Sequence, residues 1–213
     1  MGGADLWSLA QGAATTLGVS FLAILFAAPV GLGLALIRWA KIRPLDPVVA
    51  TLVSALRATP AVTLVLLVYF ALPTVGLSLS PFAAAVATLA LGSMAFHCEI
   101  WRGVLLAFPA EQLDAARAFG MTGRQRFRRI VAPQAWRFAL PALVNEMTLL
   151  IKVSPAVSVI GVVELTRAAV RIGATTYAPV PPFLIALAFY VPAIGGIVAL
   201  QRLLERRYGT LPA

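Results

Sequence analysis

Five long apolar stretches place the strongest constraint on how this chain can fold. They cover residues 15–37, 48–72, 81–105, 138–160 and 182–200. A helix needs about 20 mostly apolar residues to cross the hydrocarbon core of a bilayer, and each stretch is close to that length. Of the 213 residues, 61% are hydrophobic and 12% are charged, whereas soluble domains carry about 25% charged residues. The sequence therefore predicts an all-α, polytopic membrane bundle of five transmembrane helices, and it excludes a disordered chain and most soluble enzymes.

The basic residues indicate how these helices are oriented. Segments 38–43, 102–137 and 202–207 hold three, seven and three of the Lys and Arg residues, which is thirteen of the seventeen. Five crossings would place all three segments on one side, and cytoplasmic segments carry the excess of Lys and Arg, so we expect the N-terminus outside and the C-terminus in the cytoplasm. The net charge of +9 then reflects topology rather than nucleic-acid binding. The first apolar stretch exceeds the core of a signal peptide, so we expect it to remain in the mature protein.

The hydrophilic segment 102–137 begins with a predicted short helix over residues 109–120. Pro109 suits the first position of a helix, Glu111 and Asp114 suit its first turns, and Gly120 can end it. Small side chains in the second half would let this helix enter a groove on another protein. The alternative is an amphipathic helix that lies on the membrane surface.

The order of residues in this segment resembles the EAA loop of the membrane subunits of ABC importers. That loop reads Glu-Ala-Ala, three residues, Gly, nine residues, Ile, one residue, Leu-Pro. The chain matches the spacing with Asp114-Ala-Ala, Gly120 and Ile130-Val-Ala-Pro133, with Asp114 in place of Glu and Ala132 in place of Leu. Further stretches are similar, in the same order, to motifs of the polar amino acid subfamily: Arg57-Ala-Thr-Pro60, the run from Leu67 to Pro73, Glu99-Ile-Trp-Arg-Gly103, Pro133-Gln-Ala-Trp-Arg137, the run from Leu140 to Glu146 and the run from Val159 to Leu165.

The resemblance implies the permease subunit of an ATP-binding-cassette importer that moves a polar amino acid inward across a bacterial cytoplasmic membrane. It implies one permease domain over residues 1–213, with a cytoplasmic coupling loop at about 106–136. The implied partners are a second permease subunit, identical or paralogous, two cytoplasmic ATPase subunits and an extracytoplasmic amino-acid-binding protein. The residues that would meet the ATPase are Asp114, Ala115, Ala116, Gly120, Met121 and Pro133.

Other interpretations of the transport activity remain open. The same machinery could carry an amino-acid derivative such as cystine or an opine, or the chain could be an ATP-independent channel or secondary transporter, in which the coupling loop would have no role. The chain lacks a phosphate-binding Gly-rich loop that ends in Lys-Ser or Lys-Thr. We therefore expect ATP and Mg to be bound by the partner ATPase, and no cofactor, metal or enzymatic activity in this chain.

Polar residues inside the apolar stretches are candidates for the solute path, because a charge in mid-span costs about 2.5–3.5 kcal/mol and usually faces the bundle interior. The candidates are Arg57, Thr59, Pro60, Glu146, Lys152, Ser154 and Pro155. Glu146 and Lys152 could instead form structural ion pairs with residues such as Arg57 or with the second subunit. Pro155 has no N–H, so the carbonyl of Ile151 loses its helical partner and we expect the helix to break there. The family usually reads Lys-Asp-Thr-Ser-Leu at 152–156, so Val153 stands where an acid is common.

Three further predictions concern an ion pair, a metal site and an outer segment. Glu99 and Arg102 are three residues apart, so they are expected to pair, with a gating or interface role as the alternative. His97 and Cys98 have no partners at metal-ligand spacing, so no metal site is expected. Glu164, with Arg167 and Arg171, is expected on an amphipathic outer segment that could meet the binding protein.

Overall fold

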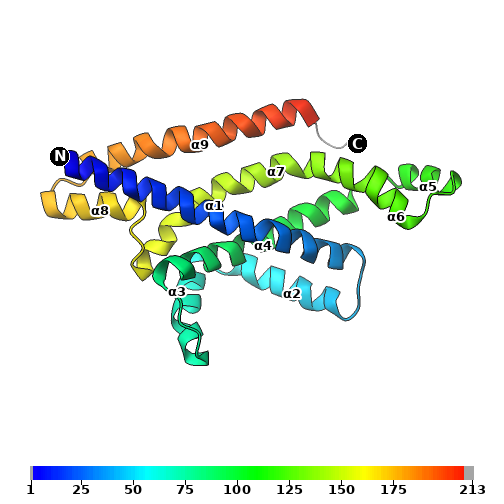
Figure 1. The fold of residues 1–213 in the computed structure, drawn as a ribbon, viewed down its shortest axis with the longest axis horizontal. Helices are drawn as coiled ribbons and strands as arrows, with labels where there is room; N and C mark the ends of the chain where they lie inside the picture. Colours follow the sequence, from blue (N-terminus) through cyan, green and yellow to red (C-terminus); the bar gives the residue numbers. More distant parts are fainter. Residues whose placement is uncertain (1, 209–213) are drawn as a thin grey trace.

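The computed structural model describes residues 2–208, and helices account for most of that range. In chain order the elements are α1 (Gly3–Trp39), α2 (Leu45–Ala58), α3 (Ala61–Ala71), the 3₁₀ helix η1 (Leu72–Val75), α4 (Pro81–Leu106), α5 (Ala110–Ala118), α6 (Gly123–Arg126), the π-helical η2 (Phe127–Val131), α7 (Ala132–Val153), the 3₁₀ helix η3 (Ser154–Ile160), α8 (Leu165–Thr176) and α9 (Val180–Tyr208). Figure 1 shows α1, α4, α7 and α9 running along the length of the molecule.

Four helical segments in the described range are long and apolar enough to cross a membrane, and a bent helix pair can provide a fifth crossing. The four are α1, α4, the continuous segment Gly123–Ile160 and α9. The bent pair is α2 with the segment Ala61–Val75, which contains α3 and η1, and their axes differ by 111°. The predicted all-α membrane bundle is confirmed. The predicted straight span over 48–72 is instead a pair of helices at a sharp angle, which forms either a broken span or a re-entrant loop.

Pro60 accounts for the bend between α2 and α3. Thr59 precedes it in an extended conformation, with φ −83° and ψ 126°, because a residue before proline disfavours the helical region. Pro60 also lacks the N–H that would continue the hydrogen bonds of α2. The chain therefore leaves α2 at Ala58 and restarts as α3 at Ala61 in a new direction.

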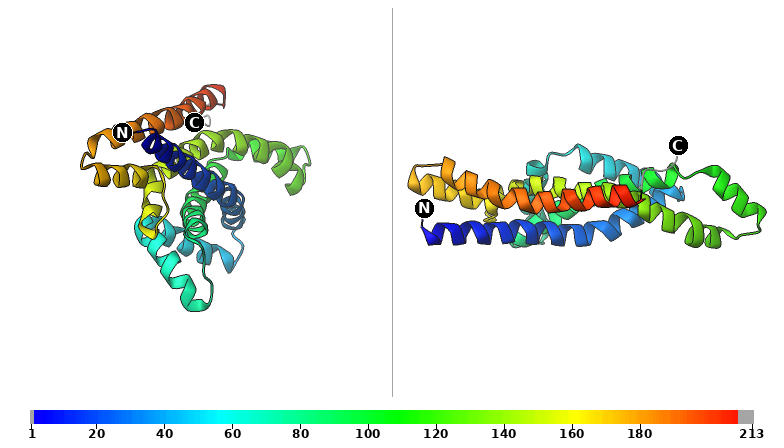
Figure 2. Two further views of the ribbon diagram at one scale, coloured as in Figure 1. Left: turned by 60° about the vertical axis from the view of Figure 1, so that its left-hand side comes forward. Right: turned by 90° about the horizontal axis from the view of Figure 1, so that it is seen from above.

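The basic segments gather at one end of the bundle. Figures 1 and 2 show the N-terminus at the opposite end from α5, α6 and the C-terminal end of α9. Arg38 lies in the last turn of α1, and Arg206 and Arg207 lie in the last turn of α9. The structure thus places the three basic segments together, in agreement with the grouping from which the orientation was predicted.

Glu164 is buried, contrary to the prediction that it lies on an outer surface. Its side chain is 0% exposed, and its carboxylate accepts hydrogen bonds from the backbone N–H groups of Thr166 at 2.8 Å and Arg167 at 2.6 Å. Tyr190 of α9 donates a third, at 3.4 Å. A carboxylate at the N-cap satisfies the free N–H groups that begin a helix, so Glu164 caps α8 and is not available to another protein.

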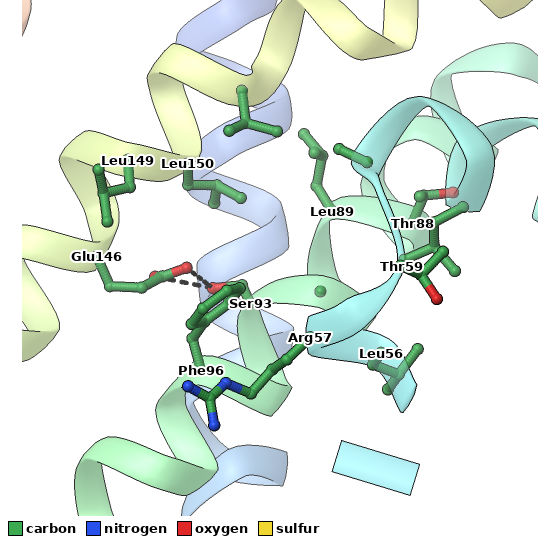
Figure 3. Close-up of a pocket in the computed structure, with 14 residues that line it drawn as sticks. Leu56, Arg57, Thr59, Thr88, Leu89, Ser93, Phe96, Glu146, Leu149 and Leu150 are labelled. Carbon is green, nitrogen blue, oxygen red and sulfur yellow. Dashed lines mark hydrogen bonds between the residues drawn. The ribbon is translucent and has the colours of Figure 1, made fainter. Parts of the chain in front are cut away.

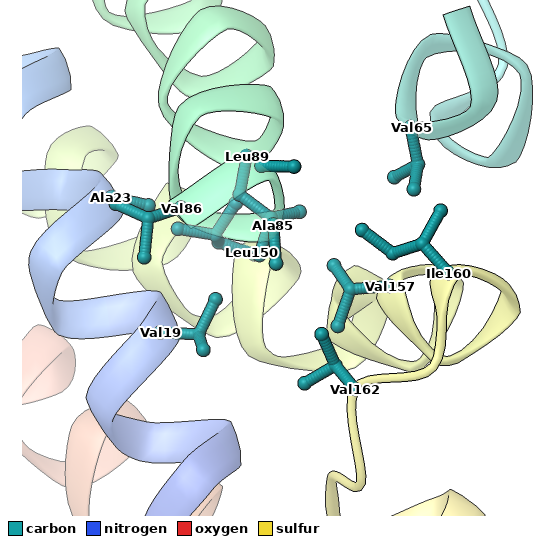
Figure 4. Close-up of a cluster of buried hydrophobic side chains, with 11 residues drawn as sticks. Val19, Ala23, Val65, Ala85, Val86, Leu89, Leu150, Val157, Ile160 and Val162 are labelled. Atoms are coloured by element: carbon teal, nitrogen blue, oxygen red, sulfur yellow. The ribbon is translucent and has the colours of Figure 1, made fainter. Parts of the chain in front are cut away.

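Apolar side chains from five elements meet where the long helices cross. Val19 of α1, Leu89 of α4, Leu150 of α7, Val65 of α3 and Val157 of η3 belong to one buried cluster (Figure 4). All five are buried. This apolar cluster holds α3 against α4 and η3. Two of its members, Leu89 and Leu150, also line the cavity described next.

Candidate functional site

A cavity of about 330 Å³ opens beside the bend between α2 and α3, against α4 and α7. Its lining is Leu56, Arg57, Thr59, Ala61, Leu64, Thr88, Leu89, Gly92, Ser93, Phe96, Glu146, Leu149, Leu150 and Val153. Small-molecule sites typically have volumes of about 300–1,000 Å³ and combine apolar walls with a few polar groups. This cavity has both properties, since its apolar walls carry two charged side chains and three hydroxyls.

Glu146 provides the negative charge of the cavity. The residue is 5% exposed and belongs to α7. The hydroxyl of Ser93, on α4, lies 2.9 Å from each carboxylate oxygen, and Nε2 of His97 lies 3.2 Å from one of them. Figure 3 shows the Glu146 carboxylate directed from α7 toward Ser93. The two residues of α4 are four positions apart, so they share one helix face. The Ser93 hydroxyl donates to the carboxylate, and the His97 ring lies beside it.

Arg57 provides the positive charge. It lies in the last turn of α2, directly before the bend, and its guanidinium carbon is 5.4 Å from the centre of the Phe96 ring, a cation–π distance. One of its nitrogens is 3.9 Å from a carboxylate oxygen of Glu99. Figure 3 shows Arg57 and Glu146 entering from α2 and α7, with Ser93 and Phe96 of α4 between them.

Glu99 joins three helices through arginine side chains. The predicted pair with Arg102 is confirmed, with the shortest contact at 2.7 Å. Arg38 of α1 also bonds the carboxylate, and it lies 3.8 Å from Asp46. Three guanidiniums therefore face two carboxylates, which leaves a surplus positive charge. Arg57 makes the longest of these contacts with Glu99, and its side chain is 43% exposed, so it is the arginine best able to bind an anion in the cavity.

The predicted path residues divide into two groups. The cavity brings Arg57, Thr59 and Glu146 together, whereas Pro60, Lys152, Ser154 and Pro155 do not line it. Lys152 is exposed on the surface of the single chain. The predicted break is a change of helix type within one continuous segment, because α7 ends at Val153 and the 3₁₀ helix η3 begins at Ser154.

The residues missed from the sequence are the partners of Glu146 and Glu99. Ser93 and Phe96 line the cavity, and Arg38 bonds Glu99 from 61 residues away. The i, i+4 spacing of Ser93 and His97 was a signal that they share a face of one helix. Nothing in the sequence indicated that this face meets Glu146.

The predicted short helix is α5, which lies at the end of the bundle that carries the basic segments (Figure 1). Pro109 precedes it, and Gly120 follows with a left-handed φ of +72°. Asp114, Ala115, Gly120 and Pro133 are exposed, and Met121 is half-buried. Phe119, which the sequence analysis did not single out, is 87% exposed.

Ala116 differs from its neighbours on α5. It is 4% exposed and packs within this chain. A large side chain at Ala116 would therefore disturb the loop itself, so such a substitution would not separate loss of docking from damage to the loop.

Comparison with known proteins places these features in a family. The model of the family described as "Binding-protein-dependent transport system inner membrane component" matches residues 27–210. The chain is 38% identical to the nopaline transport system permease protein of Agrobacterium fabrum, over 83% of this chain and 78% of that protein. It is 32% identical to the arginine transport system permease protein of Bacillus subtilis, over 92% of this chain and 90% of that protein.

A solved structure agrees with this assignment. A chain of an amino acid ABC transporter, crystallised with histidines, has a TM-score of 0.88, 36% sequence identity and 94% coverage of both chains. The resemblance found in the sequence motifs is thus confirmed by relatives and by fold. The chain belongs to the family of inner membrane components of binding-protein-dependent transport systems.

Proposed function

We propose that this chain is the permease subunit of an ABC importer that carries a polar amino acid, or a derivative of one, inward across the inner membrane of a bacterium. Its membership of the family and its similarity to permeases for nopaline and arginine support this proposal. The observation that carries it is the cavity with Glu146 and Arg57 in its lining. A solute with only one charged group would pair with only one of these two side chains.

An amino acid carries an ammonium group and a carboxylate close together, and the cavity offers a complementary group for each. The Glu146 carboxylate would accept hydrogen bonds from the ammonium group or from a cationic side chain. The Arg57 guanidinium would donate to the carboxylate. Charge-assisted hydrogen bonds of this kind are stronger than neutral ones, and the apolar walls reduce screening by water.

A second permease subunit is part of the proposal, and Lys152 supports it. This lysine lies within the candidate span Gly123–Ile160 and is exposed on the single chain. Its neighbours Leu149 and Val153 are 48% and 41% exposed. An ammonium group that faced lipid there would cost about 2.5–3.5 kcal/mol. A partner subunit, with or without a water-filled path between the two, would remove that cost.

ATPase subunits at the cytoplasmic face complete the proposed assembly. They would bind ATP and Mg, and an extracytoplasmic binding protein would deliver the solute. The exposed ring of Phe119 at the end of α5 supports a docking surface for the ATPase. An ATP-independent channel or secondary transporter would leave this aromatic side chain and the matched loop motif without a role.

The test is ATP-driven uptake in proteoliposomes that contain the permease, its ATPase and its binding protein, with L-arginine, L-cystine and nopaline as radiolabelled probes. Glu146→Gln should raise KM about tenfold or more, because a hydrogen bond to a charged group is worth about 1.5–3 kcal/mol. Glu205→Gln is the matched control, since Glu205 is exposed near the end of α9 and outside the cavity. If Glu146→Gln transported every carried probe with the wild-type KM, the solute site would lie elsewhere.

A further inference from the structure

His97, the one histidine in the sequence, lies against the carboxylate of Glu146 but does not line the cavity. The residue is 1% exposed. Its Nε2 is 3.2 Å from Glu146 Oε2, yet neither ring nitrogen has a well-oriented hydrogen-bond partner among the described residues. Buried polar groups without partners are uncommon in native structures.

α1 approaches the backbone of α4 closely at His97. A Cβ atom placed on Gly31 would lie 2.6 Å from the Cβ of His97 and 2.8 Å from the carbonyl oxygen of Met94. These distances are shorter than van der Waals contact, so only glycine allows α1 to approach α4 this closely. His97 therefore has its Cβ close to the α1 backbone and its Nε2 beside the Glu146 carboxylate.

Glu146 is the only acidic group within 4.0 Å of His97 among the residues that the structure describes. On the α1 side the contacting residue is Gly31, which has no side chain. On α4 itself the nearby acid is Glu99, which Arg38 and Arg102 already bond. On α2 the charged residue is Arg57, whose guanidinium lies over the Phe96 ring and within ion-pair distance of Glu99.

This arrangement connects a proton on His97 to the charge that Glu146 presents to the cavity. An imidazole is the side chain that most readily exchanges a proton between about pH 5 and about pH 8. A neutral His97 leaves the Glu146 carboxylate with its full negative charge. An imidazolium at the same place forms a buried ion pair with Glu146, and the pair together presents almost no net charge to a solute.

We propose that His97 is a positioning residue that controls how strongly Glu146 attracts the cationic group of the solute. When His97 binds a proton, the cavity loses affinity for that group, and when it releases the proton, the affinity returns. Because the two events are linked, a bound solute cation also opposes protonation of His97. This inference rests on the proposed function, since it requires a solute cation at Glu146.

The experiment measures KM for L-arginine as a function of pH, because the charges of L-arginine do not change between about pH 5 and about pH 8. The complete importer in proteoliposomes is compared with the same complex carrying His97→Gln in the permease. Glutamine keeps a side-chain N–H donor but cannot take up a proton in this range. The ATPase and the binding protein are the same in both samples, so their own pH dependence cancels in the comparison.

The wild-type KM should rise about tenfold more than that of His97→Gln between about pH 7.5 and about pH 5.5, a typical size for coupling between two sites. Ser93→Ala is the second variant. It removes a hydrogen bond to Glu146 but leaves the His97–Glu146 pair, so the pH dependence of KM should persist. A purely structural role for His97 would alter assembly or the maximal rate and would not change the slope of KM against pH.

Two results would overturn the inference, and they differ in what else they overturn. If Glu146→Gln raises KM at about pH 7.5 while His97→Gln keeps the full wild-type pH dependence, the solute site stands and the role of His97 is wrong. If Glu146→Gln leaves KM unchanged, the proposed solute site fails and the inference fails with it. If His97→Gln does not assemble, the test falls to Ser93→Ala, which keeps the His97–Glu146 pair. Loss of the wild-type pH dependence of KM in Ser93→Ala would then contradict the inference.

Discussion

The hydroxyl of Ser154 donates a 2.8 Å hydrogen bond to the carbonyl of Ile151, the same carbonyl that Pro155 leaves without its helical partner. Ser154 is 0% exposed, so no water reaches the bond. The break between α7 and η3 therefore satisfies its own backbone, as it must inside a membrane, where an unpaired carbonyl is costly. This relationship makes the break a stable feature of the fold.

Ser154→Ala should therefore destabilise the protein by about 1–3 kcal/mol, the cost of leaving a buried acceptor unpaired. Thermal unfolding in mild detergent measures the change. Pro155→Ala provides the matched background, because alanine, unlike proline, has a backbone N–H that can bond the Ile151 carbonyl. In that background Ser154→Ala should lower the free energy of unfolding by a clearly smaller amount. An equal cost in both backgrounds would show that the Ser154 hydroxyl does not replace the missing N–H.

Five crossings predict opposite accessibility for two exposed loop positions. Single cysteines at Ser78, after η1, and at Thr122, before α6, should react with an impermeant thiol reagent from the outside and from the cytoplasm, respectively. Cys98 is buried, which keeps background labelling low. Labelling of right-side-out and inverted vesicles distinguishes the two sides. If the bent pair α2–α3 returned to the side from which it entered, Ser78 would instead react from the cytoplasm and Thr122 from the outside.

Glu99→Gln should destabilise the bundle by about 2 kcal/mol or more, because it leaves neighbouring guanidiniums without their shared counter-charge. Asp114→Asn is a matched control. Asp114 also bonds an arginine three residues later, Arg117 at 2.7 Å, but its side chain is 66% exposed, compared with 18% for Glu99. Exposed pairs contribute only about 0–1 kcal/mol. Equal shifts in the unfolding temperature of the two variants would contradict a special role for the Glu99 contacts.

The features that could be predicted from the sequence are those that involve residues close together in the chain. Pro155 acts on the adjacent backbone, and Glu99 and Arg102 are neighbours on one helix, so both features could be predicted. Pro60 also acts on the adjacent backbone, but the size of the bend that it produces was not predicted. The contact between Ser93 and Glu146 spans 53 residues and depends on which faces of α4 and α7 meet. Glu164 was misplaced for a similar reason, because an N-cap on a buried helix end looks like a surface acid until the contact with α9 is known.

The surface that meets the ATPase is predicted to centre on Phe119 and Gly120. Phe119 is 87% exposed although it is aromatic, and exposed aromatic side chains commonly dominate binding energy when a partner covers them. Phe119→Ala should leave membrane insertion and thermal stability unchanged but weaken ATPase binding by about 2 kcal/mol or more, roughly thirtyfold in affinity. Co-purification and titration of the ATPase in detergent measure this loss.

Tyr177 supplies the control and Gly120 the independent test. Tyr177 is 94% exposed and lies at the end of α8, on the part of the molecule far from α5 (Figure 1), so Tyr177→Ala should bind the ATPase normally. Gly120 has a φ of +72° and open space around it, so Gly120→Val strains the turn that presents Phe119 without a clash inside this chain. Gly120→Ala should be milder, because alanine tolerates positive φ better than a β-branched residue does. Wild-type ATPase affinity and uptake in both Phe119→Ala and Gly120→Val would show that α5 is not the docking element, and the ATPase would then have to bind elsewhere on the basic end of the bundle.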